Sequence, residues 1–335
     1  MKFVDDLGRE YPVFSRDTDG GQDRLYLHVP ADGPVSAPKG LRVLGPDGKE
    51  LTRTPALEAT NYRNTSGLRQ ANSGDAAGAS FFVWSDFVST WGTDDAYACF
   101  VVCVRDPKAS DYYDQWTTEA LAKKGLCFGY SVMSLRFRGA NSVQQLPSTY
   151  EAGARRAYDL TRFSDEASLK TDIVQRQYTQ QDRAFLKLTK ESYGRGGAEI
   201  RARAIAAIQK NGGAMVTIRR GASGHAVVAY RVTDSPPNFV LSVYDPNLPF
   251  SAGEQTSAAF RQSVLSESRI VVGPNGDWFG TSLGWLGGRN SISVVDQIPA
   301  NDPQLPDNFS IASLVTSAGG GGARRALRPR ESRRA

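Results

Sequence analysis

The sequence contains few of the residues that build metal sites and disulfide frameworks. Only three cysteines and two histidines occur among 335 residues. A structural zinc site built from Cys and His needs four ligands, and no Cys-x-x-Cys pair is present, so we expect no metal and no other cofactor. An odd number of cysteines without paired spacing also argues against a disulfide framework. We therefore expect Cys99 and Cys103, which lie among aromatic residues and valines, to fill a hydrophobic core.

Long hydrophobic runs are also missing. No stretch approaches the eighteen consecutive apolar residues of a transmembrane helix, so we expect no membrane span. The first residues lack the basic segment and apolar run of a secretory signal. Together with the free cysteines, this predicts a cytoplasmic protein by default, with signal-independent export as the open alternative.

Excess charge of either sign is absent from most of the chain. The formal net charge is +5, from 40 basic and 35 acidic residues. The last thirteen residues hold six of the arginines and one glutamate, so the rest of the chain has 34 residues of each sign. A nucleic-acid-binding body carries its basic residues on a folded face, so we expect no nucleic-acid partner for the body. The arginines follow the glycine run 319–322 and predict a flexible tail that contacts anionic surfaces weakly, if at all.

The first part of the chain is rich in residues that favour strands. Alternating, aromatic and β-branched segments predict strands in the ranges Arg24–Val29, Leu41–Leu51, Ser80–Phe87 and Tyr97–Val104. Pro46-Asp47-Gly48 supplies a turn inside the second range. This spacing predicts a small N-terminal β-sandwich domain over residues 1–108.

Helical patterns begin after Asp106-Pro107, and strands return later. Phe128, Val132 and Leu135 mark one face of a helix that starts close to Cys127. The sequence also predicts, in chain order, helical segments Arg155–Lys190 and Ala198–Lys210, strands Ala214–Arg219, His225–Val232 and Phe239–Tyr244, and a hairpin from Ser268 to Gly280. We predict a second, α+β domain over residues 109–300, with Trp278 and Trp285 packed on its sheet, followed by a loose tail over 301–335.

Cys127 lies where this helix is expected to begin. A thiol reacts only as the thiolate, and the N–H groups at a helix N-terminus stabilise the thiolate. Gly125 and Gly129 on either side allow a substrate to approach the backbone closely. The structural alternative is a buried cysteine that only fills space.

His225 begins a predicted strand, and an imidazole near a thiol can take its proton. If Val232 pairs with Phe239 in the following hairpin, His225 lies opposite Pro246. Asp245 and Asn247 then flank the histidine across the ladder, where either side chain can orient the ring. The alternatives are a purely structural histidine and a simple strand-ending turn at Asp245-Pro246-Asn247.

Three short motifs, GLCFGYS, GHAVVAYRV and SVYDPNLP, occur in this order in the chain. Together they resemble the papain-like cysteine peptidase superfamily, over about residues 110–295. The resemblance implies a papain-like fold with a helix bearing Cys127 packed on an antiparallel sheet. It also implies Cys127 as nucleophile, His225 as base and Asp245 as orienting residue. The family's oxyanion-hole glutamine is replaced by Leu121 at the matching position, and Gln115 is the nearest candidate donor.

The resemblance implies a thiol hydrolase, most directly a cysteine peptidase with a protein or peptide substrate and a thioester intermediate. Two alternatives remain open. The same residues serve acyl transfer or deamidation, as in transglutaminase-like proteins and papain-fold toxins. In the second alternative, the papain-like part is a catalytically degenerate scaffold and the N-terminal domain is a binding module.

Overall fold

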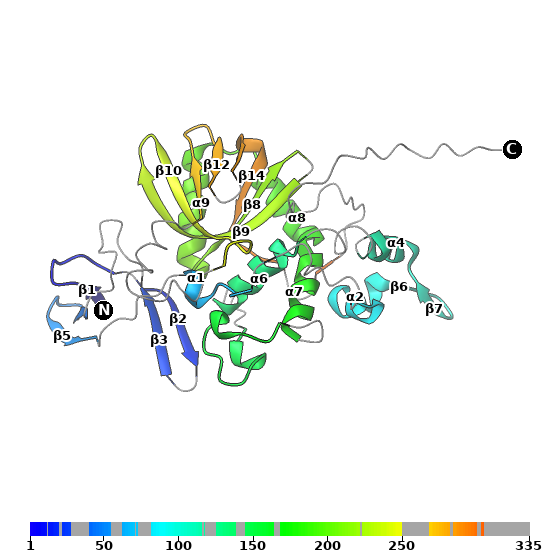
Figure 1. Ribbon diagram of the computed structural model, residues 1–335, viewed down its shortest axis with the longest axis horizontal. Helices are drawn as coiled ribbons and strands as arrows, with labels where there is room; N and C mark the ends of the chain where they lie inside the picture. The colour runs from blue at the N-terminus through cyan, green and yellow to red at the C-terminus, as the bar shows by residue number, and fades with distance from the viewer. Residues whose placement is uncertain are drawn as a thin grey trace.

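Helices and one large antiparallel sheet make up the computed structural model, so the predicted α+β class is confirmed (Figure 1). The structure describes residues 1–11, 13–19, 22–27, 40–54, 62–70, 72, 82–115, 117, 125–138, 145–163, 168–221, 223–249, 268–281, 284–299 and 303–304. His28, most of 116–124 and the basic tail lie outside these residues. Each described helix is too short or too polar to cross a lipid bilayer.

The described residues contain α-helices and several short 3-10 turns. The α-helices are α1 (Tyr62–Thr65), α2 (Trp84–Trp91), α3 (Thr93–Ala96), α4 (Pro107–Gln115), α6 (Cys127–Phe137), α7 (Ser168–Tyr178), α8 (Arg183–Ser192) and α9 (Gly197–Asn211). The 3-10 turns are η4 (Pro147–Thr149), η5 (Ala157–Asp159), η6 (Thr179–Gln181) and η8 (Arg289–Ser291).

The large sheet has seven strands in the order β13-β12-β11-β10-β9-β8-β14, and every neighbouring pair is antiparallel. The strands are β8 (Ala214–Arg220), β9 (Ser223–Ser235), β10 (Asn238–Tyr244), β11 (Arg269–Val272), β12 (Trp278–Gly280), β13 (Trp285–Gly287) and β14 (Ile292–Val295). The strands and the hairpin predicted between residues 214 and 280 are therefore confirmed, each within a few residues.

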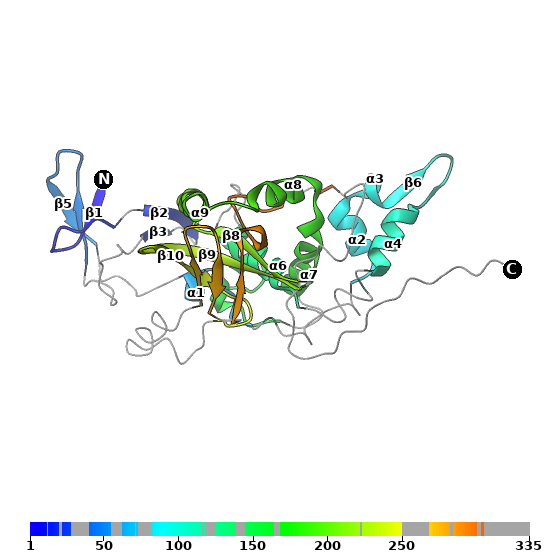
Figure 2. The same cartoon turned by 90° about the horizontal axis from the view of Figure 1, so that it is seen from above.

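Helices cover both faces of this sheet. α9 packs its buried Ile200, Ala204 and Ile208 against one face, where Trp278 and Trp285 are also buried as predicted. α6 packs Phe128 and Val132 against the other face (Figures 1 and 2). α9 follows the predicted periodicity, with its apolar residues in one buried stripe. Phe128, Val132 and Leu135 of α6 share a face as predicted, but all of α6 is buried, so other elements cover its remaining sides as well.

The N-terminal part differs from the predicted β-sandwich. Among the described residues, β1 (Lys2–Val4), β4 (Arg42–Leu44) and β5 (Glu50–Arg53) form a three-stranded sheet. β2 (Val13–Asp19) and β3 (Gln22–Leu27) form a separate hairpin. The turn predicted at Pro46-Asp47-Gly48 connects β4 and β5 as expected. The short helices α1 to α3 follow, and α2 overlaps a range for which a strand was predicted.

The strand predicted over Ser80–Phe87 is wrong from Trp84 onward, since α2 begins there. Trp84, Phe87 and Trp91 are spaced for one helical face, and Phe87 packs edge-on against Tyr178 of α7, with ring centroids 6.2 Å apart. This aromatic packing outweighs the strand preference of the individual residues. The hydrophobic core continues from α2 into α6 and α7, so the core has no break at residue 108.

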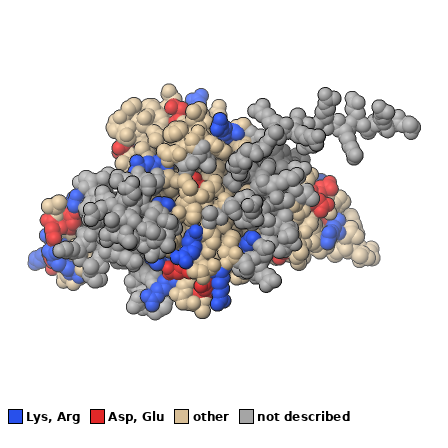
Figure 3. All heavy atoms as spheres, in the orientation of Figure 1, with Lys and Arg blue, Asp and Glu red and all other residues tan. Residues whose placement is uncertain are grey.

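Charged side chains of both signs are interspersed over the described part of the face shown in Figure 3, as expected for a body with balanced charge.

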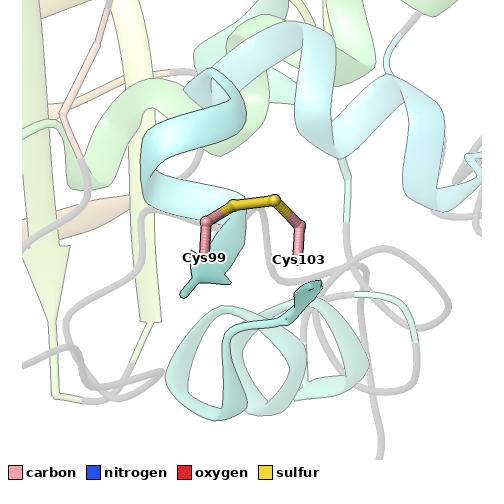
Figure 4. The surroundings of a disulfide bond; sticks show 2 residues. All are labelled: Cys99 and Cys103. Carbon is pink, nitrogen blue, oxygen red and sulfur yellow. A yellow bond between two sulfur atoms is a disulfide. The ribbon is translucent and has the colours of Figure 1, made fainter. Parts of the chain in front are cut away.

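Cys99 and Cys103 do not fill a core. They form a disulfide that joins β6 (Tyr97–Cys99) to β7 (Cys103–Arg105), and both residues are exposed (Figure 4). The short hairpin brings the two cysteines opposite each other, which four-residue spacing alone did not indicate.

Candidate active site

Cys127 is the first residue of α6, as the sequence predicts, and it is a free cysteine. The preceding Leu126 has non-helical backbone angles, and its carbonyl accepts the N–H of Tyr130 at 3.0 Å. The thiol therefore lies at the end of the helix where the N–H groups converge, which favours negative charge on sulfur.

Gly129 serves helix packing in the structure. A Cβ at this position would lie 2.0 Å from the carbonyl oxygen of Ile173 in α7. The N–H of Gly129 donates to Oε1 of Gln177, also in α7, at 2.8 Å. Gly129 therefore allows α6 and α7 to cross closely, which differs from the expected role in substrate approach.

His225 lies on β9 and Asp245 directly follows β10, the neighbouring strand. Nε2 of His225 donates to Oδ1 of Asp245 at 2.8 Å, and both side chains are buried. The same Oδ1 accepts the N–H of Asn247 at 2.9 Å. These bonds fix the carboxylate against the ring from one side.

The register that creates this contact differs slightly from the predicted one. Val232 pairs with Leu241 instead of Phe239, and the pairing shifts again between Ser242 and Val243. The two strands extend further into the predicted loop than expected, since β9 ends at Ser235 and β10 begins at Asn238. Asp245 still reaches His225, because the two shifts are in opposite directions.

The pKa of His225 is raised from 6.5 to about 10. Burial alone lowers this pKa, because the charged ring loses its hydration. The charge of Asp245 and its hydrogen bond outweigh burial, and a hydrogen bond and charge at Cys127 raise the pKa further. The imidazolium is therefore the stable form of the ring at neutral pH.

The three predicted side chains thus lie together in the order sulfur, ring, carboxylate. Since Nε2 binds Asp245, Nδ1 is the nitrogen left for the thiol. Within the described part of the chain, no oxygen or nitrogen satisfies Nδ1 with ordinary hydrogen-bond geometry. A buried polar atom left in this way is common where a group has a chemical role.

Asn72 is a further residue of the site that no local sequence pattern indicated. Its Oδ1 accepts the N–H of Leu126 at 2.5 Å, and its Nδ2 donates to Oδ1 of Asn247 at 2.8 Å. Its own N–H donates to the carbonyl of Pro246 at 2.8 Å. Asn72 therefore connects the residue before Cys127 with the two residues after Asp245.

The two secondary candidates occupy different places. Asn247 contacts Asp245 and Asn72, so it supports the carboxylate and does not replace it as the partner of His225. Gln115 is exposed at the C-terminal end of α4, and no contact between Gln115 and Cys127 is found among the described residues. Its role as an oxyanion donor stays a prediction that this geometry does not support.

The site is closed to solvent in this conformation. Cys127, His225 and Asp245 are 0%, 1% and 0% exposed. A substrate reaches the sulfur only after the residues that cover it move aside. The described ranges contain no group of three or more His, Cys, Asp or Glu side chains arranged to hold a metal ion.

Comparisons with known proteins found no relative of this chain. No family model matches the chain, and neither a curated protein nor a solved structure is similar to it. Function is therefore inferred from the geometry of Cys127, His225 and Asp245.

Proposed function

We propose that the protein is a thiol hydrolase of the cysteine peptidase type, with Cys127 as nucleophile, His225 as proton carrier and Asp245 as orienting residue. The observation that carries this proposal is the buried His225–Asp245 hydrogen bond of 2.8 Å beside a free thiol at a helix N-terminus. A buried structural histidine also needs a hydrogen-bond partner, but it does not need a free thiol at a helix start on its other side.

The chemistry follows from the charges. One proton is shared between the sulfur of Cys127 and Nδ1 of His225. With that proton on Nδ1, as the raised pKa of His225 favours, the sulfur is a thiolate and attacks the acyl carbon of the substrate. The imidazolium then gives that proton to the leaving amine, and the C–N bond breaks to leave a thioester. Water attacks the thioester with His225 as base, which releases the acid and restores the thiol. Asp245 keeps the ring oriented throughout.

The start of α6 offers a place for the negative oxygen of the tetrahedral intermediate. The backbone N–H of Cys127 has no acceptor among the described residues, and N–H groups at a helix start are suited to bind an oxyanion. The second donor is unassigned. Nδ2 of Asn72 gives one of its two hydrogens to Oδ1 of Asn247.

A papain-like fold is part of this proposal. It is supported by the chain order of a helix that starts with Cys127, a strand that carries His225 and a following strand that ends at Asp245. α6 also packs on the antiparallel sheet through Phe128 and Val132. This arrangement agrees with the motif order that the sequence resemblance is based on.

Hydrolysis of fluorescein-labelled casein by wild type and by Cys127→Ala tests the proposal. Activity should fall by about a thousandfold or more, because no nucleophile remains. The matched control is Cys99→Ala with Cys103→Ala, which removes the other two cysteines and should retain activity. Equal hydrolysis by Cys127→Ala and wild type would rule the nucleophile out.

Acyl transfer uses the same first half-reaction and is separated by its acceptor. Addition of a primary amine to the assay leads to incorporation of the amine if the thioester is transferred. Plain cleavage without incorporation supports the peptidase.

One observation favours a second candidate, a non-catalytic protein that retains the triad as a remnant. The thiol is wholly buried among apolar side chains such as Phe128 and Val228. Alkylation of Cys127 by iodoacetamide near neutral pH distinguishes the two. Rapid labelling that is lost in His225→Ala supports the enzyme, and labelling only after unfolding supports the remnant.

A further inference from the structure

The tip of the β6–β7 hairpin exposes an unusual run of apolar side chains. Phe100, Val101 and Val102 are 98%, 99% and 72% exposed, and Val104 on β7 is 58% exposed. Such residues are normally buried, and exposed apolar groups that are contiguous mark interaction sites. The hairpin extends from the helical end of the molecule, away from the large sheet (Figures 1 and 2).

The disulfide between Cys99 and Cys103 closes this tip into a short loop (Figure 4). A closed loop has fewer conformations than an open one, so the three apolar side chains cannot collapse onto the body of the protein at low cost. Phe100, Val101 and Val102 are consecutive, and all are largely exposed, so the tip is apolar on all sides.

Aromatic residues and an arginine lie directly below the tip. Nε1 of Trp84 donates to the hydroxyl of Tyr97 at 3.0 Å, and the guanidinium of Arg105 lies 4.4 Å from the centre of the Trp84 ring. Tryptophan, tyrosine and arginine are residues that combine apolar surface with a polar group. Trp84 is buried in the core, whereas Tyr97 is half-buried and Arg105 is exposed, so polar groups that face water begin directly below the apolar tip.

Acidic residues are set further back. Residues 82–115 contain six aspartates against Arg105 and Lys108, although the whole chain is positive. Asp94 on α3 and Asp111 on α4 are exposed. In Figure 3 the end of the molecule that carries the hairpin shows red and blue atoms behind an uncharged tip.

We propose that this hairpin tip is a membrane anchor that inserts Phe100, Val101 and Val102 into the surface of a zwitterionic bilayer. A protein pocket of ordinary depth covers one side of a hairpin, whereas a bilayer surrounds a projecting tip and removes all of its apolar sides from water. The aspartates oppose attraction to anionic lipid, which leaves burial of apolar surface as the source of binding. The interaction is independent of the proposed catalysis.

Flotation of the full chain with phosphatidylcholine vesicles tests the anchor. The test variant is Phe100→Ser, Val101→Ser and Val102→Ser combined. The matched control is Leu7→Ser, Leu51→Ser and Leu286→Ser combined, since these leucines are 79%, 62% and 69% exposed elsewhere. Thermal unfolding of each protein establishes that both triple variants fold.

The wild type and the control variant should float with the vesicles, and the tip variant should bind at least tenfold more weakly. This difference should persist at high salt, because salt screens charge and does not weaken apolar burial. Wild type that stays with the soluble fraction overturns the proposal, as does a tip variant that floats like wild type. Dimers without vesicles that the tip variant abolishes would identify a second copy as the occupant and overturn it too.

Discussion

The chain places similar sequence segments around its cysteines and uses them in opposite ways. Cys127 in GLCFGYS is buried as a free thiol beside a charged imidazole. Cys99 and Cys103 in YACFVVCV are exposed and bonded to each other at a hairpin tip. Both segments contain aromatic and apolar neighbours, so local composition does not decide the chemistry of a cysteine. The chemistry of a cysteine is decided by the partner that the fold places next to it.

The largest effect is expected when the negative charge of the buried carboxylate beside His225 is removed. Asp245→Asn leaves the His225 imidazolium without its counter-charge and should lower the free energy of unfolding by about 3–5 kcal/mol. Urea unfolding measures this. The matched control is Asp234→Asn, on the same hairpin. It breaks the exposed ion pair between Asp234 and Arg201 and should change the free energy of unfolding little. Equal effects of both variants would show that the buried pair is not special.

The same pair predicts a dependence of stability on pH. Because folding raises the pKa of His225 from 6.5 to about 10, the folded state holds the proton more tightly. The stabilisation is complete below pH 6.5 and is lost as pH rises through about 10. The Asp245→Asn variant should lose most of this slope in urea unfolding between these pH values. If the contribution of His225 to the stability of the wild type increased with pH over this range, the prediction would be wrong.

A smaller effect is expected at Asn72, which supports the buried thiol from outside the triad. Asn72→Ala leaves the N–H of Leu126 unpaired and should cost about 1–3 kcal/mol of unfolding free energy. Alkylation of Cys127 should also slow several-fold, because the start of α6 is less well fixed. Asn72→Asp keeps an acceptor for Leu126 and should recover part of both effects. If Ala and wild type label at the same rate, Asn72 has no positioning role.

The smallest effect belongs to the exposed pair. Cys99→Ser with Cys103→Ser opens a five-residue loop, for which the chain-entropy relation gives at most about 2 kcal/mol. Thermal unfolding measures the loss, and the reactivity of Cys127 should stay at its wild-type value. A change in Cys127 labelling would mean that the two regions are coupled.

The parts of the fold that were predictable have regular local patterns. Phe128, Val132 and Leu135 repeat with the helical period, and α9 ends at Asn211, one residue beyond the predicted range, where Gly212 adopts a left-handed backbone. α2 was mispredicted because Trp84 and Phe87 favour strands in isolation, while their helical face packs against distant rings.

The three candidate residues could be proposed from the sequence because Cys127 lies at a predicted helix start, His225 begins a predicted strand and Asp245 follows the next one. Their contact depends on a strand register that the predicted loop length placed slightly wrong. Asn72 could not be found, because its side chain bonds to residues 54 and 175 positions away and no local pattern precedes it. Its polar contacts exist only in the folded chain.

The most direct test of the account is the titration of His225 by nuclear magnetic resonance. The chain has only two histidines, so His28→Gln leaves a single imidazole signal. We predict that this ring stays charged at neutral pH and titrates near pH 10, and that Asp245→Asn or Cys127→Ala lowers its pKa. A ring that titrates at or below 6.5 in the folded protein, or that ignores both substitutions, would contradict it.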